Sequence, residues 1–326
     1  MNEKGKKGLE IGVGAAAVAV GMAASLAYII TRIFVSEALD RNEPKVMTLY
    51  KKAMFGNAEF EEETVQRIRA GREKLEGRNL EQVEIESTDG LKLKGHWFPA
   101  EGTPKRTILA MHGWRSGWSR DFSIINEFWH AEDCNILFAE QRGQGESEGQ
   151  NMGFGLKERY DVVEWLKWLN ENKVGEEPVY LAGISMGAST VMMAAGLPLP
   201  ENVHGIMADC GFTSPDAIWK HVMEDNLKIN YALHRPLIAA MVSARIKDEL
   251  MDYSCEDALK DSKVPLLLIH GEADSFVPAA MSCENYSACG AEKRMLIVPG
   301  AEHGLSYLVD EDAYRKAVLD FWKEFD

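Results

Sequence analysis

A serine stands between two glycines at the point where an apolar run gives way to a helical pattern. The run Val179–Ala182 is followed by Gly183-Ile184-Ser185-Met186-Gly187, and a helix-like stretch comes next. In a strand–turn–helix of this kind the glycines allow a sharp turn. The serine hydroxyl is then exposed at the head of a helix, where amide groups face developing negative charge. We therefore predict that Ser185 is a nucleophile.

A serine hydroxyl attacks poorly unless a base removes its proton. Of the eight histidines, only His303 follows the last strand-like run, in the loop Pro299–Gly304. His112 and His270 also lie at strand ends, each directly before a glycine, and we expect both to bond loop backbone as structural residues. His303 is the predicted base.

The base needs a carboxylate that fixes its tautomer and stabilises the imidazolium. Asp274 lies in the loop after Leu266–Ile269 and gives the chain order serine, aspartate, histidine. Asp209 also ends a strand-like run and is the alternative acid, or else a turn residue that bonds its own backbone. We predict Asp274.

The tetrahedral intermediate of acyl transfer needs amide donors for its oxyanion. One should be the N–H of Met186, directly after the nucleophile. The other should come from His112-Gly113-Trp114, which follows Thr107–Met111, and the N–H of Trp114 is the candidate. We expect the Trp114 indole to line the substrate pocket.

The elements that must position these residues alternate between strands and helices. A hairpin is predicted over Gln82–Gly95, with its turn at Thr88-Asp89-Gly90. The later strand-like runs are Thr107–Met111, Asn135–Ala139, Val179–Ala182, Val203–Ala208, Leu266–Ile269 and Met295–Val298. This alternation predicts an α/β fold with a mostly parallel sheet, helices on both faces and ligands at the carboxyl ends of the strands.

Over roughly residues 80–326 the chain resembles the α/β-hydrolases, in particular bacterial membrane-anchored members grouped with serine aminopeptidase-like and esterase/lipase proteins. The serine turn, the His-Gly-Trp loop, the Asp274 segment and the Glu-His-Gly loop follow the order of that family. Arg142-Gly143-Gln144-Gly145-Glu146-Ser147 matches a structural turn of the family, although Glu140-Gln141 replaces the usual preceding aspartate.

The stretch of about residues 212–263 interrupts the strand–helix alternation. The resemblance implies a helical cap over the site, with Trp219 and Met241 expected to contact substrate. The alternative is that these helices have one apolar face and simply cover the core.

No charged residue occurs between Ile11 and Thr31, a run of 21 positions. As a helix it spans about 31 Å, enough for the hydrocarbon core of a bilayer. We predict a membrane anchor over residues 1–35, a helical stalk over 36–80 and a hydrolase domain over 81–326. A signal peptide cleaved after Ser25-Leu26-Ala27 is the alternative, and a buried soluble helix is a further one.

The charges beside this run give only a slight preference for one orientation. Basic residues flank both ends of the run: Lys4, Lys6, Lys7, Arg32, Arg41 and Lys45. Because the count is nearly tied, the short tail and its free amine favour tail-inside. We expect a single-pass protein of the cell membrane with its catalytic domain on the extracytoplasmic side.

Composition narrows the classes of partner and cofactor. The 326 residues include 36 Lys+Arg and 51 Asp+Glu, a net charge of −15, which disfavours nucleic acid. The five cysteines form no Cys-x-x-Cys pair and there is no His-Glu-x-x-His, so neither metal nor cofactor is expected. Gly12-Val13-Gly14 begins a dinucleotide-like pattern, but no strand precedes it.

These inferences predict a serine hydrolase that cleaves a small-molecule carboxylic ester or other acyl substrate through an acyl-enzyme. The same three groups also serve a peptidase (aminopeptidase-like), a thioesterase or an acyltransferase. A membrane-tethered binding module without catalysis is the alternative from another class. The sequence leaves the oligomeric state open.

Overall fold

The computed structural model describes residues 3–44, 62–247, 251 and 253–326. Its centre is one eight-stranded sheet with the order β1-β2-β4-β3-β5-β6-β7-β8. The strands are β1 Glu81–Glu86, β2 Lys92–Phe98, β3 Arg106–Met111, β4 Cys134–Ala139, β5 Val179–Ile184, β6 Val203–Asp209, β7 Leu266–Gly271 and β8 Lys293–Val298. The predicted hairpin is formed by β1 and β2, which pair in antiparallel fashion, and β2 is also antiparallel to β4. The remaining five pairs are parallel.

Burial along the strands explains why the sequence forms this sheet. Every residue of β3, β4 and β7 is buried, as in a parallel sheet covered on both faces. The edge strand β1 instead alternates, with Val83 and Ile85 turned inward between exposed neighbours. The strand residues thus supply two cores, one on each face.

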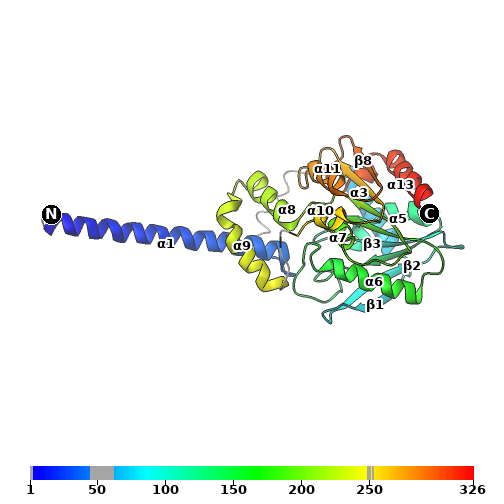
Figure 1. The fold of residues 1–326 in the computed structure, drawn as a ribbon, viewed down its shortest axis with the longest axis horizontal. Coiled ribbons are helices and arrows are strands. Elements are labelled where there is room, and N and C mark those ends of the chain that lie inside the picture. Colours follow the sequence, from blue (N-terminus) through cyan, green and yellow to red (C-terminus); the bar gives the residue numbers. More distant parts are fainter. Residues whose placement is uncertain (1–2, 45–61, 248–250, 252) are drawn as a thin grey trace.

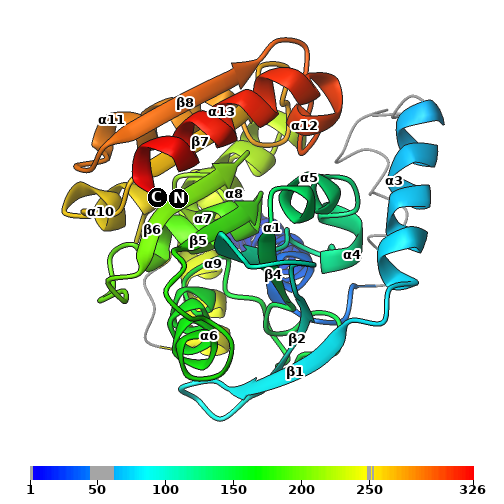
Figure 2. The ribbon, with the colours of Figure 1, turned by 90° about the vertical axis from the view of Figure 1, so that its right-hand side faces the viewer.

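Helices cover both faces of the sheet (Figure 2). The helices that pack around the sheet are α5 Ile125–Ala131, α6 Glu158–Asn172, α7 Met186–Ala194, α11 Ala279–Ala288, α12 Ser306–Val309 and α13 Glu311–Phe325. On one face α6 and α7 pack with Leu109 and Leu181, and on the other α5 and α13 pack with Ile108 and Phe138. The α/β architecture predicted from the alternation is present.

The N-terminal helix α1 is longer than the predicted anchor. It runs unbroken over Glu3–Leu39, about 55 Å at 1.5 Å per residue, and projects from the body (Figure 1). Val20, Met22 and Leu26 are 69%, 70% and 59% exposed, whereas Val35 and Leu39 belong to the main core. The helix does not end at residue 35, because its last turns bury their apolar side chains in the body.

Residues Ala19–Leu39 make α1 long and apolar enough to cross a membrane, a property that an N-terminal signal sequence shares. Of the predicted stalk, residues 36–39 belong to α1 and Glu62–Glu76 form α3, while 45–61 lie outside the described residues. Helix α3 lies beside the short helix α4 (Trp118–Asp121), on the outside of the body (Figure 2).

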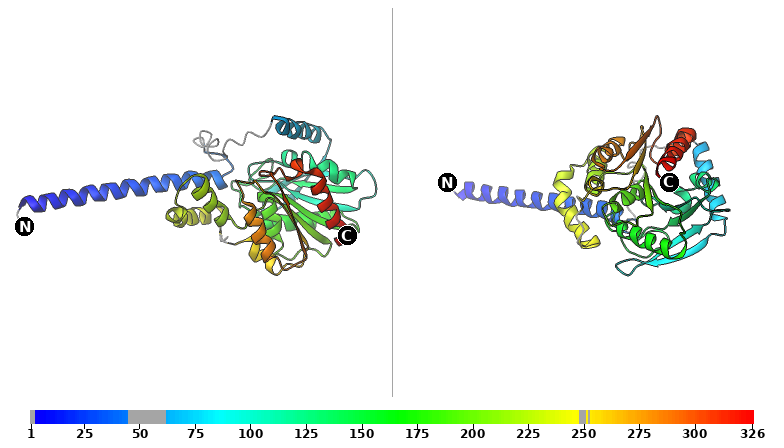
Figure 3. Two further views of the ribbon diagram at one scale, coloured as in Figure 1. Left: turned by 90° about the horizontal axis from the view of Figure 1, so that it is seen from above. Right: turned by 45° about the vertical axis from the view of Figure 1, so that its right-hand side comes forward.

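The insertion between β6 and β7 is helical, as predicted, but it covers α1 and the core. It contains α8 (Pro215–His221), the π-helix η2 (Val222–Asn226), α9 (Tyr231–Ile246) and α10 (Cys255–Lys260). Helix α9 packs beside α1 where α1 enters the body (Figure 3). The buried Thr31 is hydrogen-bonded to His234 of α9, with 2.7 Å between Oγ1 and Nδ1.

Candidate active site

Ser185 occupies a sharp turn between β5 and α7. Its backbone has φ 56° and ψ −119°, a conformation that costs energy for a residue with a side chain. Gly187 permits the turn, because a Cβ there would lie 1.9 Å from the carbonyl oxygen of Met111. Gly183 is equally constrained, since its Cβ would lie 2.3 Å from the backbone of Gly187. The two glycines therefore let the strained serine stand at the head of α7.

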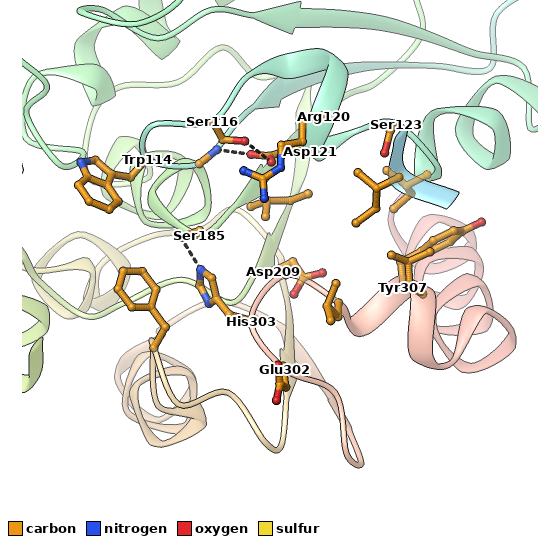
Figure 4. Close-up of a pocket in the computed structure, with 18 of the residues that line it drawn as sticks. Trp114, Ser116, Arg120, Asp121, Ser123, Ser185, Asp209, Glu302, His303 and Tyr307 are labelled. Atoms are coloured by element: carbon orange, nitrogen blue, oxygen red, sulfur yellow. Dashed lines mark hydrogen bonds between the residues drawn. The ribbon is translucent and has the colours of Figure 1, made fainter. Parts of the chain in front are cut away.

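The structure brings the three predicted residues into one hydrogen-bonded chain. The hydroxyl of Ser185 donates to Nε2 of His303 at 2.9 Å, and Nδ1–H of His303 donates to Oδ2 of Asp274 at 2.6 Å. The tautomer with its proton on Nδ1 satisfies both bonds. Figure 4 shows the bond from Ser185 to His303 at the floor of a cavity. This arrangement can transfer a proton from the serine to the imidazole.

Asp274 is held as a carboxylate. Its other oxygen, Oδ1, accepts the backbone N–H groups of Phe276 at 2.9 Å and Val277 at 2.8 Å. Burial by itself would raise the pKa of Asp274, but hydrogen bonds from His270 and His303 outweigh it and hold that pKa well below its ordinary value. A permanently ionised group therefore faces Nδ1 of His303.

Asp209, the alternative acid, is bonded elsewhere. Its Oδ1 accepts the hydroxyl of Ser306 at 3.1 Å, and Tyr314 also hydrogen-bonds to its carboxyl. Burial raises the pKa of Asp209 to about 6, against an opposing effect of His270. The geometry thus favours Asp274 as the partner of the imidazole.

The raised pKa of Asp209 predicts a pH dependence of stability. A carboxyl whose pKa is higher in the folded state stabilises the fold below its unfolded pKa, and this stabilisation is lost as pH rises through about 6. Between about pH 4.5 and about pH 7.5, the parent should therefore lose about 2 kcal/mol more unfolding free energy than the Asp209→Asn variant. Chemical denaturation at both pH values measures this, and equal losses would contradict it.

The two other strand-end histidines are bonded as expected of structural residues. His112 Nδ1–H donates to the carbonyl of Gly113 at 2.8 Å, and its Nε2 accepts the N–H of Gln141 at 3.2 Å. His270 Nε2 lies 2.8 Å from the carbonyl of Val277 and 3.2 Å from Oδ2 of Asp274, so it holds both this loop and the carboxylate. Gln141, which departs from the family pattern, is thereby tied to the site's scaffold.

A cavity of about 410 Å³ opens beside Ser185 and His303. Its apolar lining comes from α3, the segment after β3, the end of β5, the loop after β7 and residues 305–314: Ile68, Trp114, Ile124, Ile125, Ile184, Phe276, Leu305, Tyr307, Leu308 and Tyr314. Polar groups lie on two sides of it: Arg120 and Asp121 above Ser185 in the view of Figure 4, and Asp209 and Glu302 below. An acyl or aryl group fits the apolar part next to the nucleophile.

The residues of the insertion that were expected to contact substrate lie away from this cavity, and their role stays a prediction. Among the described residues that line it, none comes from 212–263. Trp219 is buried and packs edge-on against Phe154, with ring centroids 5.2 Å apart, and Met241 packs against the same core. Their apolar surface covers the core instead, which is the alternative reading of the insertion.

Trp114 does line the cavity, but its indole has a second function. Its Nε1–H donates to the carbonyl of Ala38 at 2.9 Å, near the end of α1. A Cβ on the neighbouring Gly113 would lie 3.3 Å from that of Ser185, so this loop passes close to the nucleophile. The roles of the Trp114 and Met186 amides as oxyanion donors stay predictions.

Sequence reasoning missed Asp121. Its carboxylate accepts the N–H of Gly113 at 2.7 Å and also the hydroxyl of Ser116, which fixes the loop that carries Trp114. The available signal was its place ten residues after Met111, in the connection that follows a predicted strand. Connections at strand ends often carry functional residues.

The loop after β3 also binds the end of α1. The side chain of Arg115 is 11% exposed, and its guanidinium donates to the carbonyls of Glu37 at 2.8 Å, Asp40 at 2.7 Å and Arg41 at 3.3 Å. Carbonyls at a helix C-terminus have no partner within the helix, so Arg115 satisfies them. The apolar helix is thus joined to the loop next to Ser185.

We expect Arg115→Met to lower the thermal midpoint of the full-length protein in detergent by several degrees, because buried carbonyls lose their donors at about 1–3 kcal/mol each. The matched control is Arg69→Met, since Arg69 is an exposed partner of Glu73 on α3. Scanning fluorimetry compares the two. Equal midpoints for both variants would show that the junction contributes nothing.

One cluster could in principle hold a metal ion. Ligand atoms of Cys210, Asp274 and His303 lie within 4.8 Å of one another. However, burial raises the pKa of the Cys210 thiol well above its ordinary value, which disfavours the thiolate that a metal needs. Asp274 and His303 are already bonded to each other. The donor set fits a hydrogen-bonded triad better than a metal site.

Comparison with known proteins gives the family. The model of the prolyl oligopeptidase family matches residues 121–325. The chain belongs to the prolyl oligopeptidase family. Family membership makes it a hydrolase of the serine type, and the matched segment contains Ser185, Asp274 and His303.

Among curated proteins of similar sequence, YfhR of Escherichia coli K12, an uncharacterized protein, is 26% identical over 252 residues, 74% of this chain and 80% of that protein. Protein bem46 of Schizosaccharomyces pombe is 24% identical over 251 residues, 76% of this chain and 77% of its own.

Among solved structures, the Pyrococcus furiosus esterase Pf2001 superposes with a TM-score of 0.61 at 22% identity, covering 77% of this chain and 93% of that one. The acylaminoacyl peptidase of Pyrococcus horikoshii gives 0.53 at 19% identity and covers 77% of this chain and 43% of that one. These likenesses show that the fold is the α/β-hydrolase fold, as the sequence resemblance implied.

Proposed function

We propose that this protein is a serine hydrolase that cleaves carboxylic esters through an acyl-enzyme, with Ser185 as nucleophile, His303 as base and Asp274 as acid. The observation that carries the proposal is the hydrogen-bonded chain from Ser185 Oγ through His303 to Asp274. Family membership supports hydrolysis but does not specify whether an ester, an amide or a thioester bond is cleaved.

The geometry supports the following sequence of steps. Ser185 Oγ attacks the ester carbonyl carbon while its proton passes to Nε2 of His303. The imidazolium is stabilised by Asp274 and then gives that proton to the leaving alcohol. Water, activated by the same imidazole, hydrolyses the acyl-enzyme and restores Ser185. The backbone amides of Trp114 and Met186 are the proposed donors to the oxyanion.

The apolar lining of the cavity supports a small-molecule substrate with an apolar acyl or aryl group. Ten apolar or aromatic side chains lie around an opening of about 410 Å³, a size at the low end of small-molecule sites. The Pyrococcus furiosus relative in fold is called an esterase, which agrees with this class of substrate.

A second candidate, cleavage of a peptide or other amide bond, is favoured by the family match. The matching family is named for an oligopeptidase, and one solved relative in fold is an acylaminoacyl peptidase. Thioester hydrolysis and acyl transfer would use the same three residues. The chemistry of Ser185 is common to all of them, so the substrate has to be decided by measurement.

The test is a matched panel on the full-length enzyme in detergent: p-nitrophenyl acetate and butyrate, an aminoacyl p-nitroanilide, an acetylated-peptide p-nitroanilide and an acyl-CoA. Ser185→Ala is the control for each. We expect kcat/KM to be highest for the esters and to depend on Ser185. Faster turnover of an amide or thioester would move the enzyme to that class, and a rate equal in the variant would refute serine catalysis.

We also propose that α1 anchors the enzyme in a membrane, with the catalytic domain outside. The support is the exposed apolar surface of residues 20–29 and the uncharged run Ile11–Thr31. The intact mass of protein extracted from membranes tests cleavage, because loss of the residues through Ala27 would make α1 a signal sequence.

Labelling of a native thiol can show on which side of the membrane the catalytic domain lies. Cys283 is exposed, and the other four cysteines are buried. In intact cells we expect a membrane-impermeant maleimide to label Cys283 but not a Cys283→Ser variant. Labelling that appears only after lysis would place the domain in the cytoplasm instead.

A further inference from the structure

Helix α9 carries an outward face without charge. Counting along the helix, the exposed residues follow one another at helical spacing: Ala232, Leu233, Pro236, Ala240, Ser243 and Ala244. Leu233 is 75% exposed and is the most exposed large apolar side chain in the described part of the chain. An apolar side chain so placed calls for a partner that removes it from water.

The charge of this segment also departs from that of the chain. No aspartate or glutamate occurs from Leu227 to Lys247, although the chain as a whole carries a net charge of −15. Of its basic residues, Arg235 and Arg245 are paired with Asp216 and Asp40, whereas the exposed Lys228 and Lys247 lie just beyond the two ends of α9. A helix with an uncharged outer face and basic flanks is typical of segments that lie on anionic lipid.

The position of α9 along α1 indicates which part of a bilayer α9 would contact. The uncharged run of α1 ends at Thr31, and Thr31 is bonded to His234 near the start of α9. Farther along, Arg245 is paired with Asp40 at 2.6 Å, so the end of α9 lies deeper in the body. Figures 1 and 3 show α9 at the end of the body from which α1 projects.

If the 21-residue run of α1 fills the hydrocarbon core, the start of α9 lies at the boundary between hydrocarbon and headgroups. Leu26 and Ile29 of α1 and Leu233 of α9 expose apolar surface near the contact between Thr31 and His234. Both surfaces would be buried by the same leaflet.

We propose that the first turns of α9, with Leu233 and Pro236, insert into the bilayer surface beside α1 and seat the catalytic domain on anionic lipid. This inference rests on the proposal that α1 spans a membrane. Helix α9 then restrains the tilt and rotation of the domain on its single anchor.

Depth-dependent quenching tests the contact in the full-length protein. The exposed thiol is first removed with Cys283→Ser, and a small NBD fluorophore is attached through Leu233→Cys. A second variant, Pro236→Cys, samples the same face. The protein is reconstituted in phosphatidylcholine/phosphatidylglycerol vesicles with or without nitroxide lipids.

Two controls bracket the result. Leu26→Cys places the label in the exposed middle of α1, and Ser243→Cys places it on the exposed face of α9 but nearer the body. We expect nitroxide lipid to quench the labels at 26 and 233 at least threefold more than the label at 243, with 236 following 233.

Suppose that the label at position 26 is quenched, but that the labels at 233 and 236 are quenched no more than the label at 243. This result would overturn the proposed contact of α9 and leave the anchor intact. A lack of quenching at 26 would refute the anchor, and the α9 contact with it. The two failures are therefore distinguishable.

Discussion

Replacing Ser185 by alanine is expected to lower kcat/KM on the preferred ester by on the order of 10⁴-fold or more, while the fold is kept. The hydroxyl is the group that forms the acyl-enzyme, and it is 2.9 Å from Nε2 of His303. Without it only the oxyanion donors and the cavity remain. Initial rates and the thermal midpoint are measured on the same preparation.

The matched control for this change is Ser287→Ala, because Ser287 is exposed on α11 and bonds the carbonyl of Cys283 at 2.8 Å. It should turn over ester at the parental rate. If Ser185→Ala kept more than about a tenth of the parental kcat/KM, the nucleophile would have to be another group.

Asp274→Asn is expected to reduce kcat by about 10⁴-fold. The amide is uncharged and can donate to Nδ1 of His303, which favours the wrong tautomer and removes the charge that stabilises the imidazolium. The lowered pKa of Asp274 favours its carboxylate form at neutral pH.

The comparison that decides the acid is Asp209→Asn, measured beside Asp274→Asn at pH 7. Asp209 bonds Ser306 and Tyr314, so its replacement should change kcat by less than about tenfold. If Asp209→Asn caused the larger loss, the acid role would pass to Asp209, and the loop that carries Asp274 would have to be assigned a structural role.

The hydrogen-bonded chain of Ser185, His303 and Asp274 could be predicted because each of the three residues follows a strand. Parallel strands end at the same edge of a sheet, so Ser185, Asp274 and His303 had to meet there once the strand–helix alternation was recognised. The two glycines around Ser185 gave the turn, since a side chain at Gly187 would clash with Met111. Local sequence was sufficient for this part.

The position of the insertion could not be predicted in the same way. An apolar face at helical spacing is the same whether it covers substrate or core, and Trp219 was assigned to substrate but packs against Phe154. Which surface it meets depends on α1, whose last turns enter the body and occupy the space beneath α9.

Contacts between distant loops were also beyond sequence reasoning. Asp121 holds Gly113, and Arg115 holds the end of α1, through backbone groups that no residue type identifies. The length of α1 was underestimated because hydropathy marks the lipid-facing part of a helix and not the turns that bury themselves in protein.

The central claim is tested most directly by a fluorophosphonate probe on the folded, full-length enzyme, followed by peptide mapping. We predict a single covalent adduct on Ser185, formed in the parent and absent from both Ser185→Ala and His303→Ala. A parent protein that retains its thermal midpoint but forms no adduct, or forms it on another residue, would contradict the account.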